Sequence, residues 1–357
     1  MIRKLLYLTS ISLSSLFIGC SDDTSMRNVD FDESAFLTNM GSGIIAPAYS
    51  DFASKTDALN ESVITFSQEL TTDNLLEVTS KLKDARLSWQ SCNMFSFGPA
   101  GDIALTSEAN IFPVDQIQIE KNIETGGYDL GTISNNDTKG LPAIAYLIHN
   151  EGQSEIEILE SFISEAGRVQ YLKDLSARLS EKAKAVSELW SNTYLSQFAS
   201  SFGTSVGSST SLLFNSMVRT YERNLRDGKI GIPVGVRSLG ETIPNSTEAY
   251  HGGYSLELAK ANLAVFKSLF NGQASSGFDD YLSAHGRDEL VSEVNEKFDA
   301  ILVNFNQLSD PLSEEITTNK IAVETTFVSM QDLVNLLKTD VASQLSISIS
   351  FIDSDGD

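Results

Sequence analysis

Apolar residues recur at three- and four-residue intervals along most of the chain, which is the spacing of one face of an α-helix. Segment 49–70 carries such a stripe, and segment 75–92 carries a more regular one. Further stripes follow in segments 169–190, 212–225, 256–270, 290–308 and 316–341. The best candidate for the alternation of a β-strand is segment 345–351. The pattern therefore predicts an all-α protein of packed helical bundles.

Segments rich in Gly, Ser, Pro and Asn separate these stripes and predict loops. They cover residues 98–101, 126–139, 200–211, 229–253 and 272–277. The break at 200–211 divides the long stripes into two sets. We therefore predict an N-terminal helical-bundle lobe over residues 46–200 and a C-terminal helical-bundle lobe over residues 201–357.

The first 45 residues have a different character. Arg3 and Lys4 precede an apolar run that ends near Ile18, and this run is shorter than the roughly 20 residues that span a bilayer. The sequence Phe17-Ile18-Gly19-Cys20 resembles a bacterial lipobox, in which the cysteine is lipidated. We predict a signal peptide over residues 1–19, lipid attachment at Cys20 and a flexible tether over residues 20–45. The alternative is an ordinary secretory signal with an incidental cysteine.

A lipid anchor of this kind would place the mature chain at the outer membrane of a bacterial cell envelope, facing the periplasm or the surface. The only other cysteine is Cys92, so lipidation of Cys20 leaves no pair for an intramolecular disulfide. The formal net charge is −23, and no Lys/Arg cluster is present to neutralise phosphates. Nucleic acid is therefore excluded as a partner.

Six short blocks follow one another along the chain. They are residues 85–89 with 95–100, then 112–115, 140–143, 229–233, 250–255, and 337–342 with 355–357. In this order the blocks resemble the imelysin family, which comprises peptidase family M75 and its iron-regulated relatives. The resemblance implies two packed helical-bundle lobes. It also implies an envelope role linked to iron or another metal such as zinc, through a metal-transport partner protein.

The family signature is Gly-x-His-x-x-Glu, or a Gly-Leu-Pro-Ala-x-Glu variant, and it corresponds to residues 140–145. Gly140 is retained, whereas Pro142 stands at the histidine position and Ala145 at the glutamate position. Asn93 occupies a further position where family members often have glutamate. Proline and alanine side chains cannot bind a metal, and asparagine cannot act as a general base. Alternatively, the proline variant never used a histidine, and only the glutamates are missing.

Other side chains are candidates for a pocket. Trp89 lies on an apolar stripe, so core packing is its default role. Arg86 lies beside that stripe and needs a partner, either an anionic ligand or a buried acid such as Asp115. His149 follows Pro142 by about two helical turns and is a candidate cation ligand, or a structural helix-end residue. His251 is a candidate pocket histidine beside Tyr250, or a surface loop residue.

These patterns leave three hypotheses. The first is a non-catalytic, lipid-anchored binding protein linked to iron or other metal uptake. The second is a metallopeptidase of the M75 type with a degenerate or non-standard metal site. The third is an interaction lipoprotein whose cleft binds a protein partner. The altered signature favours the first hypothesis.

Overall fold

The computed structural model describes residues 31–149, 152–273 and 275–351. The predicted signal peptide and Cys20 lie outside the described residues. Helices and the loops between them make up this part of the chain, and no β-strand forms within it. The all-α prediction is therefore confirmed. No helix in the same part combines the length and the apolar character that crossing a bilayer requires.

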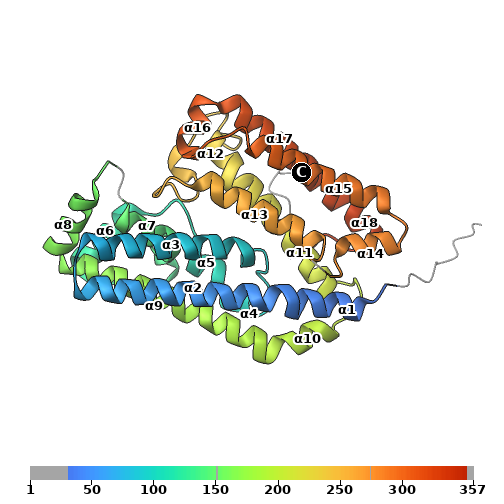
Figure 1. Ribbon diagram of the computed structural model, residues 1–357, viewed down its shortest axis with the longest axis horizontal. Helices are drawn as coiled ribbons and strands as arrows, with labels where there is room; N and C mark the ends of the chain where they lie inside the picture. The colour runs from blue at the N-terminus through green and yellow to red at the C-terminus, as the bar shows by residue number, and fades with distance from the viewer. Residues whose placement is uncertain (1–30, 150–151, 274, 352–357) are drawn as a thin grey trace, which may run out of the picture.

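The helices form two layers, which we call the N-terminal and C-terminal lobes (Figure 1). The N-terminal lobe runs from α1 to α10, with short 3₁₀ or π segments denoted η. Its elements are α1 (Glu33–Thr38), η1 (Asn39–Ile45), α2 (Ala46–Gln68), α3 (Thr72–Cys92), α4 (Pro99–Asp102), α5 (Leu105–Ala109), α6 (Gln116–Thr125), η2 (Ile133–Thr138), α7 (Gly140–Ile148), α8 (Glu155–Ser164), α9 (Ala166–Leu189), η3 (Trp190–Tyr194) and α10 (Leu195–Ser200).

The C-terminal lobe begins after a loop over residues 201–208, inside the break predicted at 200–211. Its elements are α11 (Ser209–Thr220), η4 (Tyr221–Gly231), α12 (Ile232–Val234), η5 (Pro244–Ser246), α13 (Ser255–Phe270), α14 (Phe278–Ala284), α15 (Asp288–Phe305), α16 (Leu312–Thr318), α17 (Lys320–Leu336), η6 (Leu337–Val341) and α18 (Ala342–Gln344).

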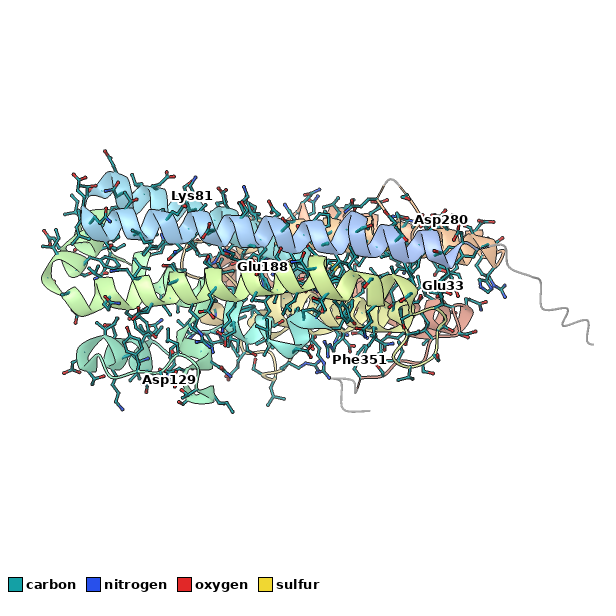
Figure 2. All side chains as sticks on the ribbon, turned by 90° about the horizontal axis from the view of Figure 1, so that it is seen from below. Glu33, Lys81, Asp129, Glu188, Asp280 and Phe351 are labelled. Atoms are coloured by element: carbon teal, nitrogen blue, oxygen red, sulfur yellow. The ribbon has the colours of Figure 1, made fainter. Side chains whose placement is uncertain are left out.

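Three long helices organise the N-terminal lobe. Helix α2 packs against both α3 and α9, and α2 and α9 lie side by side along the outer face (Figure 2). In the C-terminal lobe α15 packs against α17, and α13 lies against α3 of the other lobe. The buried side chains of both lobes form one continuous hydrophobic cluster. The stripes read from the sequence are therefore the faces that build this shared core.

The predicted tether over residues 20–45 is wrong in its second half, because the chain is helical from Glu33 onward. The carboxylate of Asp32 accepts a hydrogen bond from the backbone N–H of Ala35 and caps α1. Phe36 is fully buried and packs edge-on against the ring of Phe278, at 5.2 Å between centroids. The apolar stripe of this segment is short and lies among polar residues, so the sequence pattern did not indicate a helix. The stripe packs the N-terminal helix against the C-terminal lobe.

The predicted strand at 345–351 is also wrong. Leu345 and Ile347 are buried, but the segment pairs with no second strand. Instead, the side chain of Asn215 forms hydrogen bonds with its backbone. The Nδ2 atom of Asn215 donates to the carbonyl of Ser348, and its Oδ1 atom accepts from the backbone N–H of Ser350. Alternating apolar residues therefore fix the burial of this segment without making a sheet.

Candidate functional site between the lobes

Helix α3 supplies the N-terminal lobe's side of the contact with α13. The hydroxyl of Thr71 caps its start by accepting from the backbone N–H of Asn74. Arg86, Gln90 and Asn93 follow at four- and three-residue spacing, so they share one face of the helix. All three are buried. Polar side chains in such a position need partners, and most of these come from the C-terminal lobe.

A buried ion pair lies at the centre of this interface. The Nζ atom of Lys229, in η4, contacts Oε2 of Glu248 and donates to Oε1 of Gln90 at 2.9 Å. The other carboxylate oxygen of Glu248 accepts from Gln90 at 3.2 Å and from Asn110 at 2.8 Å. Lys229 and Glu248 are 2% and 1% exposed. The pair therefore ties α3 and the loop after α5 to two segments of the C-terminal lobe.

Asparagine side chains extend the network. Asn262, on α13, donates to the backbone carbonyl of Gln90 at 2.8 Å and to Oδ1 of Asn93 at 3.2 Å. Asn93 in turn donates to Oε1 of Gln90 at 3.3 Å. The position where the family often has glutamate is therefore a structural amide in this chain, bonded to both lobes.

Burial controls the charge state at this centre. Loss of water lowers the pKa of the Lys229 ammonium, and the nearby Arg86 guanidinium acts in the same direction. The contact with Glu248 opposes this by favouring the charged form of Lys229. The two side chains therefore depend on each other, because each would be a costly buried group without its partner.

The signature helix α7 is packed on every side. Gly140 begins it with φ = 77°, and a Cβ atom there would lie 2.5 Å from the backbone carbonyl oxygen of Ala109. Pro142 is in the first turn, where its missing N–H leaves no helical hydrogen bond unmade. Ala145 is fully buried, as are all nine residues of the helix. Glycine is retained at position 140 because the backbone of α5 approaches so closely.

The structure places Arg86 beside the signature helix, and its hydrogen-bond partners do not include Asp115. Its guanidinium donates to the backbone carbonyls of His251 and Leu141, at 3.2 and 3.4 Å, and to the hydroxyl of Tyr254 at 3.2 Å. Asp115 is exposed, and it caps α6 through the backbone N–H of Gln118. Asp115 as the buried partner of Arg86 is therefore a wrong prediction. Neutral oxygens, mostly backbone carbonyls, take that place.

His149, His251 and Tyr250 line one cavity of about 380 Å³, together with Glu155 and Glu314. His149 lies at the end of α7, where its backbone N–H donates to the carbonyl of Ala145 at 2.8 Å. Burial lowers its pKa to about 4, and the positive fields of Arg86 and His251 act in the same direction. His149 is therefore held neutral at pH 7. His251 is 8% exposed, so it is a buried residue and not a surface one.

The side chains in the described parts of the chain do not fit a metal ion. No three His, Cys, Asp or Glu residues come together there in an arrangement that holds one. Structural zinc sites need about four ligands and catalytic zinc sites about three. Cys92 is 1% exposed, and burial raises the pKa of its thiol well above its ordinary value. It is a core residue, as the sequence indicates.

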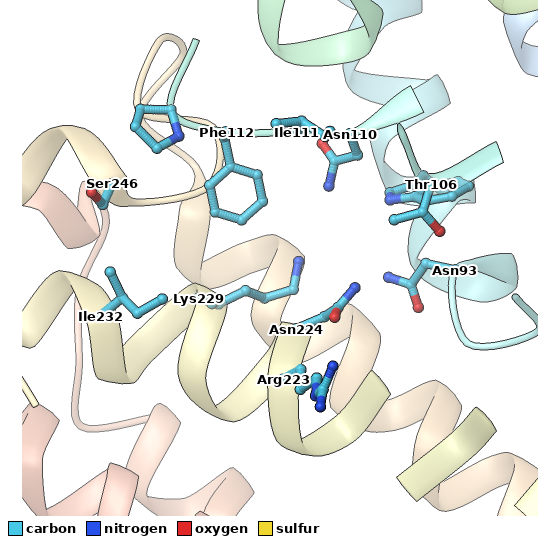
Figure 3. A pocket seen from close by; sticks show the side chains of 13 residues that line it. Asn93, Thr106, Asn110, Ile111, Phe112, Arg223, Asn224, Lys229, Ile232 and Ser246 are labelled. Atoms are coloured by element: carbon cyan, nitrogen blue, oxygen red, sulfur yellow. The ribbon is translucent and has the colours of Figure 1, made fainter. Parts of the chain in front are cut away.

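A cavity of about 300 Å³, which we call the interlobe cavity, opens between the lobes beside the Lys229–Glu248 pair (Figure 3). Trp89 and Asn93 line it from α3, so both candidates belong to this wall. Pro142, Arg86, Tyr250 and His251 line a smaller cavity of about 40 Å³. The two cavities share Phe112 and Pro113, and are therefore neighbours. The full lining of the interlobe cavity is Trp89, Asn93, Thr106, Asn110, Ile111, Phe112, Pro113, Arg223, Asn224, Gly228, Lys229, Ile232 and Ser246.

Comparison with known proteins defines the class of helical protein to which these features belong. The family model of imelysin, peptidase family M75, matches residues 45–339. The chain belongs to the imelysin family. No match was found among curated proteins.

Two crystal structures are similar in fold. One is an iron-regulated protein A precursor from Parabacteroides distasonis ATCC 8503, with a TM-score of 0.72 and 18% identity, covering 88% of this chain and 95% of that one. The other is an imelysin-like protein from Psychrobacter arcticum 273-4, with a TM-score of 0.71 and 17% identity, covering 89% and 97% of the two chains. At these identities the likeness concerns the fold.

Sequence reasoning missed the ion pair and most of its network. Lys229 and Glu248 lie at the two ends of a Gly- and Pro-rich stretch that we predicted only as a loop. Gln90 is a polar residue beside Trp89 on a core-facing helix, and Asn262 interrupts the stripe of α13 in the same way. Isolated amide residues at core positions of a helix could have indicated this network, because buried amides need hydrogen-bond partners.

The low pKa of His149 predicts a pH-dependent stability. Between pH 6.5 and about 4 the unfolded chain protonates this histidine and the folded chain does not, so the free energy of unfolding falls as the pH falls through that window. In the His149→Gln variant we expect the free energy of unfolding to fall by less between pH 7 and pH 4.5, by on the order of 2 kcal/mol, than in the wild type. Urea denaturation from pH 7 to pH 4.5 measures it, with His285→Gln as the matched control. Equal pH dependence in the two variants would contradict the assignment.

Proposed function

We propose that this chain is a lipid-anchored imelysin-family protein of the bacterial cell envelope that binds a ligand between its lobes, does not hydrolyse peptides, and serves iron or other metal uptake. One observation carries the proposal. The histidine and glutamate positions of the signature hold Pro142 and Ala145, and Asn93 stands at the further position where family members often have glutamate. A Lys229–Glu248 pair occupies the polar centre of the interface. The retained scaffold thus has a cleft without the acid and imidazole groups of the family signature.

The chemistry of the interface supports binding more than hydrolysis. Peptide hydrolysis needs a general base or a metal-activated water. The carboxylate at the interface, Glu248, already accepts from Gln90 and Asn110 and contacts Lys229. Its oxygens are therefore committed to the fold. The cavity beside it offers amide and ammonium groups, which recognise ligands.

The link to metal uptake rests on similarity in fold to an iron-regulated protein A precursor. Because the described side chains do not form a metal site, we propose that the chain serves uptake by binding a ligand other than a bare metal ion, beside a transport partner protein. The envelope location rests on Cys20 and the apolar run before it.

A proteolysis assay tests the non-catalytic assignment. The full-length mature protein is incubated with unstructured casein, alone and with iron or zinc, and each reaction is repeated with a chelator. We expect no cleavage above a blank in any reaction. Cleavage that a chelator stops would overturn the proposal and favour a metallopeptidase with a non-standard site. In that case His149→Gln and His251→Gln should abolish the cleavage.

A labelling experiment tests the anchor. Expressed with its signal sequence in a bacterial host, the chain should incorporate labelled palmitate and separate with the membrane fraction. Cys20→Ser should abolish both properties, whereas the control Cys92→Ser should keep them. Equal labelling of wild type and Cys20→Ser would reject lipid attachment at this cysteine, and a chain released after secretion would indicate an ordinary secretory signal.

A further inference from the structure

The residue types that line the interlobe cavity differ in charge from the chain as a whole. The protein carries 48 acidic and 25 basic residues, yet none of the described residues that line this cavity is an aspartate or a glutamate. Two lining residues are cationic, Lys229 and Arg223, and both come from η4. Glu248 contacts Lys229 but is not part of the lining. An anion in the cavity therefore meets cationic and amide groups, whereas the acidic surface elsewhere repels it.

Amide and hydroxyl groups complete the polar side of the cavity. Figure 3 shows the nitrogen-bearing ends of Lys229, Asn110 and Asn224 directed toward a common space, with Asn93 beside them. Asn93 and Lys229 are 4% and 2% exposed, so the ends of these groups lie in a wall that is largely closed to water. Hydrogen bonds to an ionised acceptor are stronger than neutral ones, and burial strengthens them further.

Positive charges also gather behind the wall. Arg219, one turn before Arg223 and in contact with Ser96, has a pKa lowered by burial and by the charge of Arg223. The pKa of Lys229 is lowered by burial and by Arg86. Several cations therefore raise one another's free energy around this space.

Apolar side chains make up the rest of the cavity lining. Trp89, Ile111, Phe112, Pro113 and Ile232 line it. Inorganic ions gain nothing from such a wall, whereas an organic group buries apolar surface against it. The volume of about 300 Å³ is at the lower end of the range for small-molecule pockets.

We propose that this cavity binds a small organic carboxylate, with the carboxylate on the side of Lys229, Arg223 and the asparagine amides and the organic group against Phe112 and Trp89. This inference rests on the proposed binding function and names the ligand class of that site. Arg223 is the exposed member of the set, so it lies at the rim, where it attracts the anion and closes over it.

The test uses tryptophan fluorescence, because the chain has two tryptophans and only Trp89 lines the cavity. In mature protein carrying Trp190→Phe, Trp89 is the single reporter. Acetate, succinate and phenylacetate are titrated, each against its neutral amide, with inorganic phosphate as a further arm. We expect at least one acid to bind tenfold more tightly than its amide and than phosphate. Calorimetry on the wild-type chain checks that the Trp190 substitution has not altered binding.

Two variants locate the binding. Arg223→Gln removes a rim charge from an exposed residue and should weaken acid binding about tenfold, while amide binding stays unchanged. Arg287→Gln, at the exposed start of α15, makes the same change away from the cavity and should leave both unchanged. Equal affinity for acids and amides, or equal effects of the two variants, would overturn the proposal. Phosphate binding as tight as the best acid would overturn the organic class.

The carboxylate-binding test and the proteolysis test can fail independently of each other. Chelator-sensitive proteolysis with normal acid binding would reject the non-catalytic role and keep the anion site. Absence of both proteolysis and acid binding would keep the non-catalytic role and reject the carboxylate as its ligand.

Discussion

The ion pair between Lys229 and Glu248 is the interaction on which the interface between the lobes depends. Both side chains are almost completely buried, and their contacts reach α3, the loop after α5, η4 and the segment before α13. Removing two charges from water is costly, so a pair of this kind persists only where further hydrogen bonds satisfy it. Gln90 and Asn110 do so here. The two lobes must therefore meet in one register for the pair to be satisfied.

The signature helix contributes no acidic or imidazole side chain to this centre. A signature with histidine and glutamate would place ionisable groups on α7, whereas here α7 is a fully packed apolar helix held against α5 by Gly140. The polar centre of the interface lies instead between α3 and the C-terminal lobe, where Asn93 has become part of a bonding network. The scaffold is that of the imelysin family, and the buried polar side chains of the interface between the lobes come from α3, its C-cap and the C-terminal lobe.

The long helices could be predicted from sequence because each has a regular apolar stripe, such as that of α3 through Trp89 and Cys92. The errors have local causes. Phe36 and its neighbours make a stripe too short to stand out in a polar segment, and residues 345–351 are bonded by Asn215 instead of by a strand. Arg86 was correctly expected to need a partner. Its partner could not be identified, because carbonyl oxygens are common to every residue type and leave no trace in the sequence.

The most direct test of the central claim is a double-mutant cycle on the ion pair. Chemical denaturation measures the free energy of unfolding of the wild type, of Lys229→Met, of Glu248→Gln and of the double variant. Each single change should cost about 3–5 kcal/mol, since it leaves a buried partner unsatisfied. The double variant should cost much less than their sum. The exposed pair Lys267 and Asp299, changed to Met and Asn, should show a coupling of less than about 1 kcal/mol. Additive losses at Lys229 and Glu248, or a coupling no larger than that of the exposed pair, would contradict the account.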